Sequence, residues 1–151
     1  ENPRQVARRI KNYLDRYKPV RNIELKLYRT DQEYVEICFQ RTDSPLVSII
    51  LPVYNQWDYT YSCLKSIYDN SEGIEYEVII ADDVSVDETQ HISSYVKNVK
   101  VIRNRKNLGF LLNCNNAAKH ARGKYILFLN NDTNVQKDWL KYQVDLIEKD
   151  E

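Results

Sequence analysis

The sequence feature that most constrains the fold is a nearly continuous apolar run from Val47 to Val53. A strand that is buried on both faces has this pattern, because neither of its sides meets water. A second apolar run extends from Tyr76 to Ala81, Lys100 to Arg103 is predicted as a short third strand, and Tyr125 to Leu129 is a fourth. Runs of this kind are typical of a parallel sheet that is covered by helices on both faces.

Apolar side chains at helical spacing follow each of these runs. The four stripes are Trp57, Tyr61, Leu64 and Tyr68; Ile92, Tyr95 and Val96; Phe110, Cys114, Ala117, Ala118 and Ala121; and Leu140, Val144 and Ile147. Ser85 and Glu88 match a capping box before the second stripe, and Gly123 stands where glycine is favoured after a helix. The alternation predicts an α/β fold, Rossmann-like, with a mainly parallel sheet flanked by helices.

Residues 1–44 differ in pattern from the rest of the chain. Asn2 to Gln5 is typical of a helix start, and apolar side chains follow at helical spacing as far as Tyr17. Two alternating runs, Ile23–Leu27 and Val35–Phe39, then indicate a small hairpin. We expect residues 1–44 to form a helix–hairpin appendage or linker, and residues 45–151 to form the α/β part.

Composition excludes several classes of protein. The 22 basic and 22 acidic side chains cancel, which argues against nucleic acid as the main partner, because phosphate binding needs a basic excess or a basic stripe. The longest apolar runs are far too short to cross a bilayer. Three cysteines without a CxxC pair disfavour a disulfide framework or a zinc site and suit a reducing compartment.

Polar residues follow each predicted strand, at the edge where parallel sheets bind ligands. The candidates are Pro52, Val53, Tyr54 and Asn55; Asp82 and Asp83; Arg103, Asn107 and Gly109; and Asn130, Asn131 and Asp132. Only three glycines occur, which excludes the glycine-rich loops that cradle a diphosphate. A cation such as Mg²⁺ or Mn²⁺, held by carboxylates, is the other common way to bind a diphosphate.

Residue types assign roles to some of these candidates. Asp132, with Asn130 two residues earlier, suits a metal ligand, although a turn or cap role also fits. Successive strand residues point in opposite directions, so at most one of Asp82 and Asp83 should face a ligand. The Tyr54 ring would either stack on a flat base or pack against the strand end.

Taken together, four segments resemble family 2 glycosyltransferases of the GT-A fold. They are Val47–Asn55, Ala81–Asp87, Asn107–Phe110 and Leu129–Asp132, in an order and spacing similar to those of the nucleotide-sugar half of that family. The resemblance implies that Pro52, Tyr54 and Asp83 surround the nucleobase. It also implies that Arg103 and the loop 107–109 close over the nucleotide. Asn130 stands at the first position of the family's DxD metal motif, so Asp132 would make most of the metal contact.

The resemblance further implies a function. The chain would bind a UDP- or dTDP-sugar for transfer to a glycan acceptor in bacterial polysaccharide synthesis, as rhamnosyl-type transferases do. The family's acceptor half and catalytic base would follow Glu151, so the chain alone is expected not to transfer sugar. The full protein would be cytoplasmic, with peripheral contact at the inner membrane face.

Other classes of function fit the residues less well. A non-catalytic nucleotide-binding module would use the same strand ends. A nucleotidyltransferase would need a basic, glycine-rich loop after the first strand, which residues 54–57 do not provide. A receiver-like signalling module would need a lysine after a fifth strand, and none is predicted.

Overall fold

A computed structural model describes residues 33–149 of the chain. Its elements are β1 (Ile37–Cys38), β2 (Val47–Val53), α2 (Trp57–Asn70), β3 (Tyr76–Asp82), the 3₁₀ helix η1 (Glu88–His91), α3 (Ile92–Tyr95), β4 (Val96–Lys97), β5 (Lys100–Arg103), α4 (Phe110–Ala118), β6 (Tyr125–Phe128) and α5 (Trp139–Lys149). The predicted N-terminal helix and the first hairpin arm, Ile23–Leu27, lie outside the described residues.

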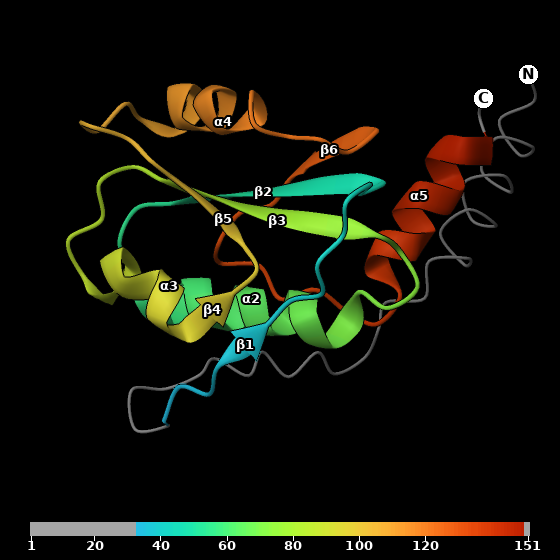
Figure 1. The fold of residues 1–151 in the computed structure, drawn as a ribbon, viewed down its shortest axis with the longest axis horizontal. Coiled ribbons are helices and arrows are strands. Elements are labelled where there is room, and N and C mark those ends of the chain that lie inside the picture. Colours follow the sequence, from blue (N-terminus) through green and yellow to red (C-terminus); the bar gives the residue numbers. More distant parts are fainter. Residues whose placement is uncertain (1–32, 150–151) are drawn as a thin grey trace, which may run out of the picture.

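The central sheet has four parallel strands in the order β5-β3-β2-β6 (Figure 1). All seven residues of β2 are buried, as the apolar run from Val47 predicts. The chain leaves β2 toward β3 and β5, and later returns to the other side of β2 as β6. The strand order therefore reverses beside β2. In open α/β sheets, the carboxyl ends of the strands at such a point form the usual ligand crevice.

Helices cover the two faces of the sheet, α2 on one and α4 on the other (Figure 1). Successive residues of β2 serve opposite faces: Ile49 packs with Leu64 of α2, whereas Ile50 packs with Ala117 of α4. Burying such a large aliphatic side chain stabilises the fold by about 1.5–3 kcal/mol. The α/β prediction is thus confirmed, with a larger core on the α2 side.

The run Val35–Phe39 does not pair as a hairpin arm among the described residues. Ile37 and Cys38 form β1, which pairs in parallel with β4. Ile37 and Phe39 are almost fully buried in the core on the α2 side. These residues therefore pack onto the α/β part, and the division of the chain after residue 44 stays a prediction.

The predicted capping box at Ser85 is wrong. Asp87 caps the short helix instead, because its Oδ1 accepts the backbone N–H of Thr89 at 3.0 Å. The hydroxyl of Ser85 is already used as an acceptor for the backbone N–H of Asn55, at 2.8 Å. The segment forms η1 and a single turn, α3, before Val96 enters β4.

A glycine is required at position 123 because the backbone of Ser48 lies close to it, and not because a helix ends there. Helix α4 ends at Ala118, so the predicted stripe stops short of Ala121. A Cβ atom on Gly123 would lie 2.6 Å from the backbone nitrogen of Ser48. The backbone N–H of Gly123 donates to the Ser48 hydroxyl at 2.9 Å, which holds this turn against β2.

Candidate functional site

A cleft of about 440 Å³ opens at the carboxyl ends of β2 and β3, beside the segment that follows β6. This is the edge at which the sequence predicts a ligand. Nine of the twelve candidates at this edge line it, all except Asn55, Asp82 and Arg103. The lining consists of Pro52, Val53, Tyr54, Gln56, Asp83, Asn107, Gly109, Phe110, Asn113, Asn130, Asn131 and Asp132.

Asp83 holds the loop that forms one wall of the cleft. Its Oδ1 accepts the backbone N–H of Leu108 and the side-chain amide of Asn104, each at 2.8 Å. Its Oδ2 accepts the backbone N–H of Gly109, also at 2.8 Å. The side chain is 4% exposed, and hydrogen bonds to a charged acceptor are roughly twice as strong as neutral ones. The carboxylate therefore fixes the loop relative to β3.

Buried amides extend this anchor into α4. Asn104 Nδ2 also donates to Asn113 Oδ1 at 2.8 Å, and Asn113 Nδ2 donates to the carbonyl of Ala81 at 2.7 Å. The network joins β3, the loop and α4 in one rigid unit. Sequence reasoning missed Asn113; an amide next to the apolar stripe of Phe110 and Cys114 was the available signal.

Gly109 ends the loop in a conformation that only glycine adopts readily. Its φ is 75° and its ψ 165°, and it stands at the N-cap of α4. Phe110, the first residue of α4, lines the cleft. The free N–H groups at a helix start favour anionic groups such as phosphates. The start of α4 therefore contributes positive electrostatic potential to the cleft.

Asp82 points away from the cleft and pairs with Arg103. It also accepts the backbone N–H of Ser85 at 2.8 Å, while Arg103 donates to the Ser85 carbonyl at 2.7 Å. Only Asp83 of the acidic pair lines the cleft, as expected. Arg103 lies outside the lining and braces the loop after β3.

The loop between β2 and α2 presents an aromatic ring at the cleft. Tyr54 is 54% exposed, and Asn55 and Gln56 turn the chain with φ values of 57° and 62°. Asn55 does not line the cleft; its Oδ1 accepts the backbone N–H of Val86 at 2.8 Å. Gln56 lines the cleft and was missed, since a left-handed glutamine has no sequence signal.

The segment after β6 is anchored on α2. The Asn131 side-chain amide donates to Thr60 Oγ1 at 3.0 Å, and the Cys63 thiol donates to the Asn130 carbonyl at 3.6 Å. Burial raises the pKa of Cys63 to about 12, with a further contribution from the nearby Asp132 charge. Asp132 itself is exposed at the cleft.

One exposed carboxylate beside an amide side chain fits a hard cation such as Mg²⁺ or Mn²⁺. Such ions take one or two carboxylates and complete their shell with water and phosphate oxygens. Within residues 33–149, no group of three or more His, Cys, Asp and Glu side chains is placed to enclose a metal ion. Asp132 therefore suits a metal ion that is also coordinated by an anionic ligand. The described residues do not provide enough side chains to coordinate a metal ion by themselves.

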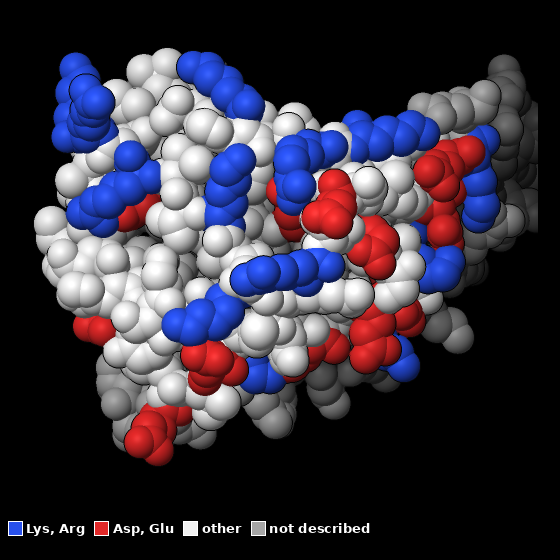
Figure 2. All heavy atoms as spheres, in the orientation of Figure 1, with Lys and Arg blue, Asp and Glu red and all other residues white. Residues whose placement is uncertain are grey.

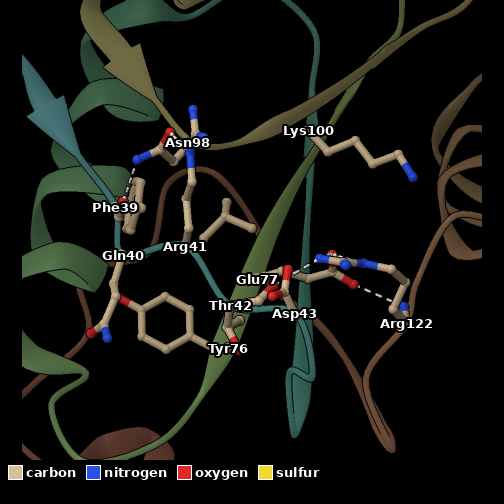
Figure 3. Close-up of a pocket in the computed structure, with 11 residues that line it drawn as sticks. Phe39, Gln40, Arg41, Thr42, Asp43, Tyr76, Glu77, Asn98, Lys100 and Arg122 are labelled. Atoms are coloured by element: carbon tan, nitrogen blue, oxygen red, sulfur yellow. Dashed lines mark hydrogen bonds and ion pairs between the residues drawn. The ribbon is translucent and has the colours of Figure 1, made fainter.

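A second hollow, of about 490 Å³, lies at the opposite end of the sheet (Figure 3). Charged side chains of this hollow form contacts that stabilise the fold. Arg122 is paired with Glu77 at 2.9 Å, and Arg41 Nε donates to Asn98 Oδ1 at 2.8 Å. The Lys100 side chain points away from both groups (Figure 3). Since these charges do not converge, the hollow is a poorer candidate than the cleft.

The sequence model that describes glycosyl transferase family 2 matches residues 48–151. The chain belongs to this family. The matched region contains every residue of the cleft, from Pro52 to Asp132. Family membership thus connects the cleft to the part of the fold that family 2 proteins share.

Relatives of the family 2 chain include named bacterial enzymes. Teichuronic acid biosynthesis glycosyltransferase TuaG of Bacillus subtilis is 36% identical over 107 residues, which cover 68% of this chain and 42% of TuaG. Poly(ribitol-phosphate) beta-glucosyltransferase of Bacillus spizizenii is 37% identical over 100 residues, covering 62% of this chain and 16% of that enzyme. The family 2 chain thus spans less than half the length of either relative.

Solved structures show the same fold. S. aureus TarS, residues 1–349, superposes with a TM-score of 0.61 and 31% identity, covering 68% of this chain and 32% of that one. The mannosyltransferase PcManGT of Pyrobaculum calidifontis, solved with GDP-Man and Mn²⁺, has a TM-score of 0.58, 23% identity and the same two coverages. The GT-A type of fold predicted from the sequence is confirmed.

Proposed function

We propose that the cleft binds a nucleoside diphosphate sugar, of the UDP or dTDP type, for transfer to a glycan acceptor in polysaccharide synthesis. One observation carries this proposal: Tyr54, the loop held by Asp83, and Asp132 meet in a single cleft at the reversal of strand order. The names of the relatives TuaG and poly(ribitol-phosphate) beta-glucosyltransferase support polysaccharide synthesis.

A pyrimidine fits the wall formed by Tyr54 and Asp83. The exposed Tyr54 ring provides a face on which a base can stack. Asp83 Oδ2 accepts one N–H in the structure, from Gly109, which leaves acceptor capacity for the N3–H of uracil or thymine. Adenine has no ring N–H at the corresponding position.

Asp132, with Asn130 beside it, would hold Mg²⁺ or Mn²⁺. A bound divalent cation neutralises charge on the diphosphate and so assists its departure. The asparagines at 130 and 131 leave Asp132 as the one carboxylate of this segment, and its exposure lets it reach a ligand in the cleft. Asn131 positions the segment through Thr60.

For the 151-residue chain itself, we propose donor binding without sugar transfer. The described lining contains two carboxylates, and neither is suited to act as the base for the acceptor. Asp83 is engaged by three donors, and Asp132 is assigned to the metal. Acceptor binding and the base would come from other parts of a protein as long as TuaG. A transfer assay on such a longer protein separates this enzyme from a non-catalytic module.

Calorimetry with UDP, dTDP, ADP and GDP in the presence of Mn²⁺ tests the base. We expect the pyrimidine diphosphates to bind more tightly. Tyr54→Ala should cost about 1 kcal/mol of binding free energy through loss of the ring contact. Tyr59→Ala, another exposed tyrosine but outside the cleft, is the matched control. Equal or tighter binding of a purine diphosphate would contradict the assignment.

Thermal shift with UDP, with and without Mn²⁺, tests the metal. Asp132→Asn should remove most of the Mn²⁺-dependent stabilisation, because a ligand stabilises only the state that it binds. Its stability without ligand should stay within about 1 kcal/mol of the parent, as for other exposed substitutions. Asp145→Asn, on α5, is the control for the charge change. UDP binding that is independent of Mn²⁺ in the parent would refute the role of Asp132.

A further inference from the structure

Charge is unevenly distributed along this electrically neutral chain. No acidic residue occurs between Glu88 and Asp132, whereas eight Lys and Arg residues do. Four of the eight have carboxylate partners, namely Lys97, Arg103, Arg122 and Lys124. Among residues 33–149, no ion pair is formed by the other four, which are Lys100, Arg105, Lys106 and Lys119. Unpaired cations gathered in one segment create a local positive potential that attracts anionic partners.

Three of these cations line one groove. Arg105, Lys106 and Lys119 border a groove of about 490 Å³ between the loop after β5 and the outer side of α4. No acidic side chain lines this groove. Lys and Arg side chains gather over the same end of the molecule, at the upper left in Figure 2. We call the groove and the first turn of α4 the basic face.

Large apolar side chains stand next to these cations. Phe110, Leu111 and Leu112 follow one another at the start of α4 and are 61%, 68% and 54% exposed. Leu112 lines the groove itself. A soluble polyanion would engage the cations and leave the leucines without a partner. A lipid surface accommodates both, since basic groups contact anionic headgroups while apolar side chains enter the interface.

We propose that the basic face docks on an anionic lipid bilayer. Arg105, Lys106 and Lys119 contact the headgroups, and Leu111 and Leu112 insert at the headgroup boundary. Phe110 belongs both to this face and to the cleft lining, so docking holds the cleft at the membrane surface. The proposal does not depend on nucleotide binding, and each can fail without the other.

Co-sedimentation with vesicles tests the docking. The probes are vesicles of phosphatidylcholine alone and vesicles in which about one lipid in three is the anionic phosphatidylglycerol. Each basic residue near an anionic surface contributes roughly a five-fold factor in affinity, so Arg105→Gln/Lys106→Gln/Lys119→Gln should weaken binding on the order of 100-fold. Lys65→Gln/Lys141→Gln/Lys149→Gln carries the same charge change on α2 and α5 and should bind like the parent.

A second variant isolates the apolar contribution. Leu111→Ser/Leu112→Ser should weaken vesicle binding about ten-fold while leaving binding to soluble polyphosphate unchanged. Because the side chains substituted on the basic face are all exposed, circular dichroism and melting of these variants should match the parent. Binding that needs phosphatidylglycerol and both sets of residues supports the proposal. Equal loss in the two triple variants, no requirement for phosphatidylglycerol, or no effect of the leucine changes would overturn it; the last result would indicate a soluble polyanion.

Discussion

Replacing Asp83 with asparagine tests the central feature of the site, the loop that this carboxylate holds. The amide oxygen of Asp83→Asn can still accept from Leu108 and Asn104, at the position of Oδ1. Its NH₂ group then faces the N–H of Gly109, which loses the carboxylate and keeps Asn107 Oδ1, at 3.1 Å, as its acceptor. The substitution keeps the side chain's shape and changes only its hydrogen-bonding pattern.

The magnitude follows from the bonds that are lost. One hydrogen bond to a charged acceptor is worth about 1.5–3 kcal/mol, and the two that remain weaken once the charge is gone. Relief of the burial of a charge offsets part of this loss. We expect the free energy of unfolding to fall by about 2–3 kcal/mol. If the free energy of opening the loop falls by the same amount, amide exchange of Gly109 should accelerate on the order of 100-fold.

Hydrogen exchange on the ligand-free protein, resolved for residues 107–109, measures this effect. Asp132→Asn is the matched control, since it changes the same charge in the same cleft at an exposed side chain. It should leave the exchange of Leu108 and Gly109 unchanged. If Asp83→Asn also leaves their exchange unchanged, or if both variants accelerate it equally, Asp83 does not hold the loop.

Two further predictions concern the opposite end of the sheet. Gly123→Ala should destabilise the protein by about 1–3 kcal/mol in chemical denaturation, because its Cβ would meet the backbone of Ser48 at 2.6 Å; Gly73→Ala, with open space around its Cβ but a φ of 82°, separates crowding from backbone strain. Burial acts to raise the pKa of Glu77, but hydrogen bonds from Ser48 and Arg122 outweigh it and hold this pKa below its usual value. A carboxyl group with a lowered pKa in the folded state stabilises above its unfolded pKa of about 4.3, and this contribution disappears as pH falls through the folded value. The stability difference between the parent and Glu77→Gln should therefore be full at neutral pH and shrink below about pH 4; a difference that grows on acidification would contradict this reasoning.

The main strands could be predicted from the sequence because burial on both faces leaves a direct signal. The runs that begin at Val47 and Tyr76 are strands whose centres are buried, where apolar side chains predominate because water has no access. The run that begins at Tyr125 is also a strand, β6, although Ile126 and Phe128 are 47% and 49% exposed. The parallel arrangement follows from the helices between them, and it brings the strand ends to one edge. Nine predicted residues therefore meet in one cleft although they are far apart in sequence.

Local signals failed where a distant partner competes for the same atom. Ser85 matches a capping box in sequence, but in the structure its hydroxyl accepts a hydrogen bond from the backbone N–H of Asn55. Ile37 and Cys38, within the alternating run Val35–Phe39, pair as β1 with β4, which lies almost 60 residues away and which no local pattern reveals. The hairpin stays a prediction, because its other arm lies outside the described residues. Gly123 is required because Ser48 approaches its backbone, a neighbour that no local pattern reveals.

The sequence by itself determined which residue types reach the ligand edge, because strand periodicity and the order of strands and helices depend on burial and chain connectivity. Tertiary structure alone decided how those residues are used. Asp83 and Asp82 are adjacent and chemically alike, but β3 turns one toward the loop at 107–109 and the other toward Arg103. The physical reason is that a side chain's hydrogen-bond partners come from whatever the fold places within about 3 Å, and those partners are remote in sequence.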